Sequence, residues 1–215
     1  MKLWLASADM KLLEELLPTG VFAGVITNPK VVTEAAQAPL DFFREVCRLA
    51  PAAYYQLRDA SAAEMLQEAD KFLAVDPKKM RIKVPATRAG FEVIHTLTGR
   101  GHEVMATAVP TASWMIFALA AGARAIAPYG GMLQKRGLVS KADEVVKMQR
   151  IIEAQHSPAE ICVGIYDVTE LPFYAAAGVR SGFVWGRDAA AFLTQPLVDE
   201  AVGGFQNDWH TLEKY

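Results

Sequence analysis

Short apolar runs alternate along this chain with longer segments in which apolar positions recur every three or four residues. The short runs are typical of buried strands, and the longer periodic segments are typical of amphipathic helices. Eight strands are predicted in this way. They cover residues 2–7, 24–28, 53–59, 80–86, 103–110, 125–130, 160–167 and 181–188.

Helical periodicity fills the spaces between these strands, for example at residues 61–73, 88–97, 111–121, 141–155 and 169–177. Strict alternation of strand and helix predicts parallel strands. Eight such repeats without a linker predict an α/β protein, a closed (β/α)8 TIM barrel, as a single domain over residues 1–215. An open doubly wound sheet is the alternative, but no Gly-rich phosphate loop supports it.

Residues 196–215 are predicted to form a C-terminal helix and tail. Phe205 and Trp209 are four residues apart, so they lie on one stripe of this helix. The stripe packs either on the chain's own barrel or on a neighbouring subunit, and the sequence alone favours neither.

Composition excludes several kinds of partner. A net charge of −2 gives no basic surface for nucleic acid, and residues 114–123 are too short an apolar run to cross a membrane. We see no signal peptide and expect a cytoplasmic protein. Cys47 and Cys162 lack CxxC spacing and are expected to be buried free thiols, and the four histidines form no metal-binding cluster.

Lys83 is the most unusual residue of the predicted strands, in the run Arg81-Ile82-Lys83-Val84-Pro85. A buried lysine is unfavourable unless it is paired or its pKa falls. The neutral amine that results is the form that attacks a carbonyl. Lys83 also lies near the C-terminal end of its strand, where barrel active sites lie. The alternative is a lysine that extends outward to solvent. Arg81, two residues earlier, either lowers the lysine pKa or pairs with an acid at the barrel base.

Neutral polar residues stand near the ends of other predicted strands, at Asn28, Gln56, Thr107 and Tyr129. A barrel would bring them to the same mouth as Lys83. Uncharged donors and acceptors around one lysine can hold a water molecule for proton transfer. Strand-end capping and packing are their ordinary alternative roles.

These residues and the motifs around them resemble the transaldolase family, most closely its small fructose-6-phosphate aldolase branch, over nearly the whole chain. The motifs are Gly24-Val25-Ile26-Thr27-Asn28-Pro29, Ile82-Lys83-Val84-Pro85-Ala86-Thr87 with Gly90, Thr107-Ala108-Val109, Ala127-Pro128-Tyr129 and Phe205-x-x-Asp208-Trp209.

The resemblance implies that Lys83 forms a Schiff base and that Gln56, Thr107 and Tyr129 hold a catalytic water. It places Asn28, with Thr27 beside it, at the donor substrate. It also implies that the enzyme needs no metal or organic cofactor. By resemblance, the protein is a homo-oligomer, a ring of five or ten subunits in which the C-terminal helix reaches a neighbour.

Three positions depart from the family pattern, and each replaces a polar or charged group with an apolar one. Ala6 stands in place of an Asp, Ile165 in place of a Ser, and Met132 in place of a phosphate-binding Arg. Sites that lose such partners no longer demand the matching hydroxyl or phosphate. We therefore expect unphosphorylated substrates, unless Arg187 or Arg58 provides a new anion site. Both arginines could equally be ion-paired surface residues.

The sequence thus predicts a class I aldolase that joins a small ketone donor to an aldehyde or cleaves the product. A transaldolase that moves a three-carbon unit between sugar phosphates is the first alternative. Gln56 and Tyr129 argue against it, because true transaldolases resemble this chain but carry Glu and Phe there. The second alternative is a metabolite-binding barrel without catalysis, which Ala6 supports.

Overall fold

Eight parallel strands close into a barrel in the order of the sequence, so the predicted (β/α)8 fold is confirmed. The computed structural model describes residues 1–212, except for the side chains of residues 130, 132 and 133. The strands are β1 (Lys2–Ala6), β2 (Phe22–Ile26), β3 (Ala53–Gln56), β4 (Met80–Pro85), β5 (Val104–Val109), β6 (Ala125–Pro128), β7 (Glu160–Ile165) and β8 (Ser181–Trp185).

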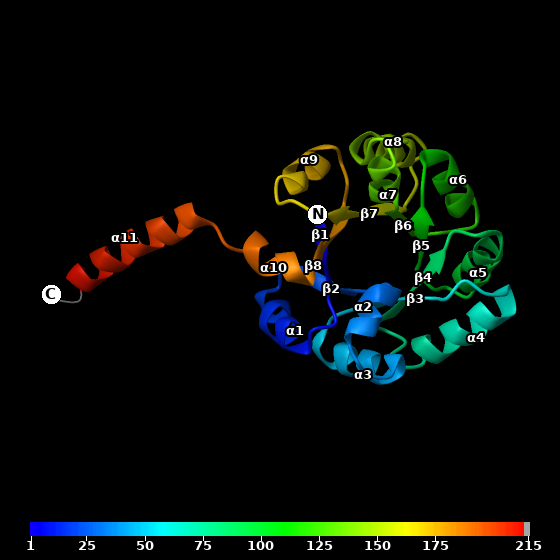
Figure 1. The fold of residues 1–215 in the computed structure, drawn as a ribbon, viewed down its shortest axis with the longest axis horizontal. Coiled ribbons are helices and arrows are strands. Elements are labelled where there is room, and N and C mark those ends of the chain that lie inside the picture. The colour runs from blue at the N-terminus through cyan, green and yellow to red at the C-terminus, as the bar shows by residue number, and fades with distance from the viewer. Residues whose placement is uncertain (213–215) are drawn as a thin grey trace.

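Helices surround the barrel on its outer side, and only the last helix extends away from it (Figure 1). They are α1 (Met10–Leu16), α2 (Pro29–Glu34), α3 (Pro39–Leu49), α4 (Ala62–Leu73), α5 (Arg88–Gly99), α6 (Ala112–Ala120), α7 (Gly130–Lys135), α8 (Lys141–Ala154), α9 (Glu170–Ala176), α10 (Gly186–Phe192) and α11 (Pro196–Leu212), with a 3-10 turn at Leu17–Thr19. Local sequence fixes several helix starts. Ser61 and Glu64 form a capping box for α4, and the Thr87 hydroxyl caps α5.

The barrel is closed by β1 and β8, which pair in continuous register from Lys2 opposite Ser181 to Ala6 opposite Trp185. The sequence predicted that this last strand would continue to residue 188, whereas β8 ends at Trp185 and α10 begins at Gly186. The chain turns there close to β1. A Cβ atom at Gly186 would lie 2.7 Å from the Ser7 hydroxyl, so the turn requires glycine.

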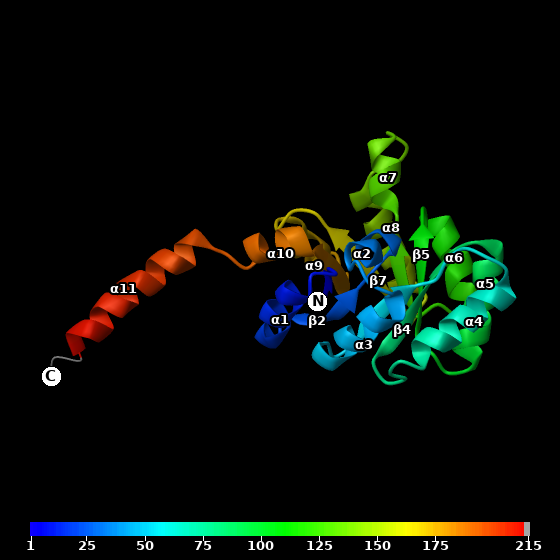
Figure 2. The ribbon, with the colours of Figure 1, turned by 60° about the horizontal axis from the view of Figure 1, so that its bottom comes forward.

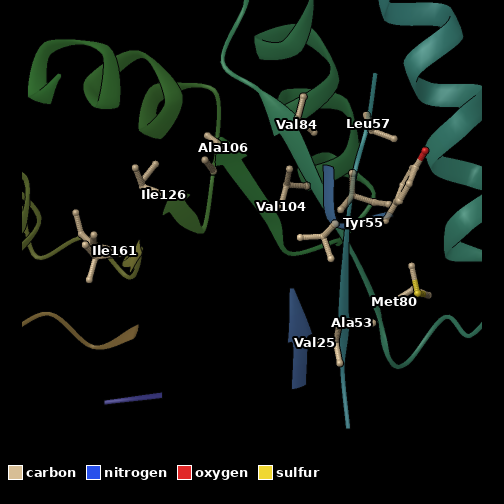
Figure 3. Packing of buried hydrophobic residues seen from close by; sticks show 14 of the residues in the cluster. Val25, Ala53, Tyr55, Leu57, Met80, Val84, Val104, Ala106, Ile126 and Ile161 are labelled. Atoms are coloured by element: carbon tan, nitrogen blue, oxygen red, sulfur yellow. The ribbon is translucent and has the colours of Figure 1, made fainter. Parts of the chain in front are cut away.

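Two apolar cores lie on the two sides of the sheet. The larger core is formed by outward-facing strand residues and the apolar faces of the helices, with Val84, Val104 and Ala106 among the residues seen in Figure 3. The smaller core fills the barrel interior and includes Trp4 and Tyr54. Because side chains alternate along each strand, membership of one core or the other shows which way each residue points.

The C-terminal helix α11 extends away from the barrel in both ribbon views (Figures 1 and 2), and none of its residues is buried. Phe205 is 61% exposed and Trp209 is 65% exposed, so within one chain their stripe contacts no barrel surface. No helix in residues 1–212 has both the length and the apolarity needed to cross a membrane.

Candidate active site

The amine of Lys83 lies inside the barrel. The residue is only 5% exposed, and its Nζ donates a hydrogen bond to the Thr27 carbonyl oxygen at 2.8 Å. The Thr27 hydroxyl in turn donates to the Tyr54 carbonyl at 2.9 Å, which holds the end of β2 against β3. The acceptor of the lysine is therefore fixed by the sheet, and the amine has a defined position.

Burial lowers the pKa of Lys83 to about 8, because the charged amine loses its hydration there. Cys162 is the smaller influence on this pKa and acts in the opposite direction. At neutral pH roughly a tenth of the amine is then unprotonated, compared with less than a thousandth for an ordinary lysine. The site can supply the neutral nucleophile that carbonyl addition requires.

Arg81 points into the opposite end of the barrel, and its charge is not a cause of the lowered Lys83 pKa. Its guanidinium pairs with Glu103 and lies 6.0 Å from the ring centroids of Trp4 and Tyr54. Of the two roles that the sequence left open, the structure therefore supports pairing with an acid at the barrel base.

Gln56 and Thr107 flank the lysine on the two neighbouring strands. Gln56 is paired in register with Lys83, and Thr107 with Pro85, which lies two residues further along β4. Thr107 precedes a bulge in which Ala108 has a φ of 58°, a conformation that non-glycine residues rarely adopt. Strain of this kind is common at functional sites, and here it stands next to a predicted water-holding residue.

Tyr129 and Asn28 lie at the rim. Tyr129 follows β6 directly, and its backbone N–H donates to the Val109 carbonyl at 2.8 Å, while the residue is 51% exposed. The Asn28 side chain caps α2 by accepting from the Val31 N–H at 2.9 Å. Asn28 thus has a structural role, and its amide is held at the end of β2.

Not all predicted site residues meet at this mouth. Ala6 points into the barrel, but Ile165 is fully buried in the core on the helix side of β7. Arg58 is largely exposed on the outside and pairs with Glu68 at 3.3 Å, so it provides no anion site inside the barrel. The predicted role of Met132 rests on a side chain outside the described part of the structure.

Sequence reasoning missed two aromatic residues at the mouth, Tyr166 at the end of β7 and Trp185 at the end of β8. Their ring centroids are 6.2 Å apart, and the guanidinium of Arg187 lies 5.5 Å from the Trp185 ring. Counting alternate residues along β7 from the inward-facing Cys162 would have identified Gly164 and Tyr166, and not Ile165, as the inward positions.

A polar cavity of about 420 Å³ opens at the other end of the barrel, with Lys2, Arg81 and Arg124 among its lining residues. Chemistry in barrel enzymes occurs at the carboxyl ends of the strands, so this cavity is a feature of the barrel base. Among the described residues, no group of three or more histidine, cysteine or acidic side chains could hold a metal ion.

A closed barrel with a buried, partly neutral lysine beside uncharged polar groups defines an enzyme of the class I aldolase and transaldolase type. Comparison with known proteins supports this class of enzyme. Residues 56–170, just over half of the chain, match the model of the Transaldolase/Fructose-6-phosphate aldolase family. The chain belongs to this family, and the resemblance seen in the sequence is confirmed.

Some curated relatives are named as transaldolases and others as fructose-6-phosphate aldolases. A probable transaldolase 2 of Listeria monocytogenes is 26% identical over all of this chain and 98% of its own length. A probable transaldolase of Chelativorans is 27% identical over 97% of this chain and 96% of its own. A probable fructose-6-phosphate aldolase of Streptococcus pneumoniae is 26% identical over 95% of this chain and 93% of its own.

The buried charge of Lys83 should reduce the stability of the folded state. Its pKa is about 8 in the folded state and about 10.4 in the unfolded chain. Below pH 8 both states are protonated and the unfavourable burial acts in full. It disappears as the pH rises from about 8 to 10.4, because the folded protein loses its proton first.

We expect Lys83→Met to increase the free energy of unfolding at pH 7 by roughly 1–3 kcal/mol, and by much less at pH 10. The range allows for the Thr27 carbonyl, which loses its donor. Urea unfolding at both pH values measures the difference. Lys71→Met, at an exposed lysine of α4, is the control and should change stability by less than about 0.5 kcal/mol. Equal destabilisation by Lys83→Met at both pH values would contradict this account.

Proposed function

We propose that this protein is a class I aldolase in which Lys83 forms a Schiff base with a small, unphosphorylated ketone. The observation that carries the proposal is the buried amine, held by the Thr27 carbonyl, whose pKa lies close to neutrality. The family contains enzymes named for both aldol cleavage and transaldol transfer, and both names are compatible with lysine chemistry.

The reaction begins when the neutral amine of Lys83 attacks the ketone carbon and water leaves, which gives an iminium. A water molecule held by Gln56, Thr107 and Tyr129 removes a proton from the adjacent carbon, and an enamine forms. The enamine carbon attacks the aldehyde carbonyl. Hydrolysis then releases the aldol and restores the lysine, and cleavage is the same sequence in reverse. Each step uses groups of this chain or water.

Transaldolase activity is the second candidate, because curated relatives carry that name. The two activities differ in what happens to the enamine, which is hydrolysed in an aldolase and kept for a second sugar in a transaldolase. Free hydroxyacetone or dihydroxyacetone would serve as a donor only for the first.

We further infer that the protein is a homo-oligomer joined partly by α11. Apolar residues recur along this helix every three or four positions and all are exposed. They are Val198, Val202, Phe205, Trp209 and Leu212. Such a stripe is stable in water only when something covers it, and a second copy of the chain is the simplest partner. Two buried free cysteines, Cys47 and Cys162, fit a reducing compartment such as the cytoplasm.

Borohydride reduction with hydroxyacetone should attach the donor to Lys83 alone, as intact mass and peptide mapping would show. Labelling should rise about tenfold per pH unit below pH 8 and level off above it, because the neutral amine is the nucleophile. Lys141, a second buried lysine, is held by Glu170 at 2.8 Å and serves as the internal control that stays unlabelled. The proposal fails if Lys83→Met is labelled as strongly as the wild type.

Tyr129→Phe should lower kcat by roughly 10²–10⁴-fold, the usual contribution of a group that assists proton transfer, while imine trapping at Lys83 persists. Steady-state kinetics and trapping are measured on the same preparation. Tyr55→Phe removes a hydroxyl that donates to Glu68 outside the barrel and should leave kcat unchanged. An unchanged kcat with a raised KM in Tyr129→Phe would assign the hydroxyl to substrate binding instead.

Deletion of residues 202–215 should reduce the size of the assembly in light scattering, because most of the apolar stripe of α11 is lost. Phe205→Ser combined with Trp209→Ser should act in the same direction. Gln206→Ser, at an exposed polar position of the same helix, should not. A monomeric wild-type protein would rule the idea out.

A further inference from the structure

Tyr166 places a phenol hydroxyl at the mouth of the barrel, and the steps described so far do not use it. The residue follows β7 directly, and the alternation of that strand turns it inward, like Cys162 and Gly164 before it. Tyr166 is 51% exposed and Lys83 only 5%, so the phenol lies at the rim and the amine lies deeper. A ketone bound to Lys83 would therefore leave the rim to the second reactant, the aldehyde.

The Tyr166 ring is held in place by the first residues of α8 and α9. The Lys141 ammonium lies 4.5 Å from the ring centroid. The Glu170 carboxylate accepts hydrogen bonds from Lys141 Nζ and from the Tyr166 backbone N–H, both at 2.8 Å. Lys141 and Glu170 thus neutralise each other, and together they fix the tyrosine beside them.

The Tyr166 hydroxyl lies between the ends of β6 and β8. On one side, a Cβ atom at Gly131, two residues after Tyr129, would lie 3.7 Å from the hydroxyl oxygen. On the other side, the Trp185 indole N–H donates to this oxygen. The O–H proton of Tyr166 has no acceptor among the described residues, so it can be donated to a bound molecule.

The groups that face this hydroxyl keep its proton in place at neutral pH. Burial is the largest influence and raises the pKa of Tyr166 above its ordinary value, and Glu170 and Tyr129 act in the same direction. Arg187 and the Trp185 N–H oppose this shift, because both stabilise the phenolate. The hydroxyl can therefore give up its proton during a reaction and recover it afterwards.

Formation of the carbon–carbon bond needs a proton donor. When the enamine attacks the aldehyde, the aldehyde oxygen gains negative charge and takes up a proton. Ala6, Gln56, Thr107 and Tyr129 are the described residues that we place around the amine, and none of them carries a carboxylate. The water that three of them hold serves the donor carbon in the proposed mechanism, so the aldehyde oxygen requires another group.

We propose that Tyr166 is a catalytic residue that donates a hydrogen bond to the aldehyde oxygen and protonates it as the bond forms. The inference rests on the proposed Schiff-base function and adds the acid of this step. The enamine carbon bonds to the aldehyde carbon, whose π electrons move to oxygen, and this oxygen takes the Tyr166 proton. The nitrogen lone pair restores the iminium at Lys83, and the phenolate regains a proton from solvent at the exposed rim. In cleavage the same transfers run in reverse.

Tyr166→Phe tests this, because it removes the hydroxyl and keeps the ring on Lys141. Two readouts report on the donor alone, namely borohydride trapping of hydroxyacetone at Lys83 and NMR exchange of its α-protons in D2O. Both should match the wild type. The kcat for addition of hydroxyacetone to glyceraldehyde should fall by roughly 10²–10⁴-fold. Tyr129→Phe, in contrast, should slow α-proton exchange as well.

Tyr174→Phe is the matched control. The Tyr174 ring also lies beside Lys141, at 5.3 Å, but it belongs to the core on the helix side and is 1% exposed. This variant should leave trapping, exchange and aldol addition unchanged.

The possible outcomes separate the claims. Equal losses of trapping, exchange and aldol addition in Tyr166→Phe would make the residue merely structural and overturn the proposal. An unchanged kcat with a raised KM for glyceraldehyde would overturn it too, because the hydroxyl would then only bind the substrate. Failure of the wild type to trap hydroxyacetone would refute the Schiff-base function itself.

A second substitution covers the case in which Tyr166→Phe does not fold. Tyr166→2,3-difluorotyrosine keeps the ring and the hydroxyl but makes the phenol a stronger acid. The alkaline fall in kcat for aldol addition should then move to lower pH, because the phenol loses its proton sooner, while the pH profile of α-proton exchange stays in place. An unmoved profile for aldol addition would contradict the assignment.

Discussion

The desolvation of one amine is the constraint on which the rest of this molecule depends. Under the proposed mechanism Lys83 has to be neutral to react, and burial in the barrel interior lowers its pKa to about 8. The residues that pack that interior, such as Trp4, Tyr54 and Met105, are apolar or aromatic and offer the ammonium no counter-charge. The same packing that lowers the pKa of Lys83 reduces the stability of the folded state at neutral pH, because the charged amine is buried there.

Closure of the barrel brings polar side chains from several strands together around the buried amine. The continuous pairing of β1 with β8 sets Ala6 against Trp185, and the pairing of β3, β4 and β5 sets Gln56 and Thr107 around Lys83. A shift of one residue in any of these registers would turn the polar side chains toward the helices. The site is therefore a consequence of strand register more than of any single loop.

The fold could be predicted from the sequence because eight apolar runs and their intervening helices are each a strong local signal. The exact ends of the strands could not be predicted. The prediction extended the last strand through Gly186 to residue 188, whereas β8 ends at Trp185 and the chain turns at Gly186 beside Ser7, a residue far away in the sequence. The direction of α11 could not be predicted either, because the sequence shows its apolar stripe but not where the helix lies relative to the barrel.

Candidate site residues that break a local pattern could be picked out from the sequence, whereas candidates that depend on their neighbours in space could not. Lys83, Gln56 and Thr107 stand out as polar residues in apolar strands. Ile165 was assigned by resemblance, and the alternation of β7 places it on the helix side. Tyr166 and Trp185 gave no signal, because two rings that follow different strands are recognised as neighbours only when the barrel has been built.

The absence of an acid on β1 has two linked effects. A carboxylate beside an amine favours the charged form and raises its pKa, so Ala6 leaves burial as the dominant influence on Lys83. Under the proposed mechanism it also means that no carboxylate of the first strand stabilises the positively charged iminium, so the barrel interior has to accommodate that charge with neutral groups.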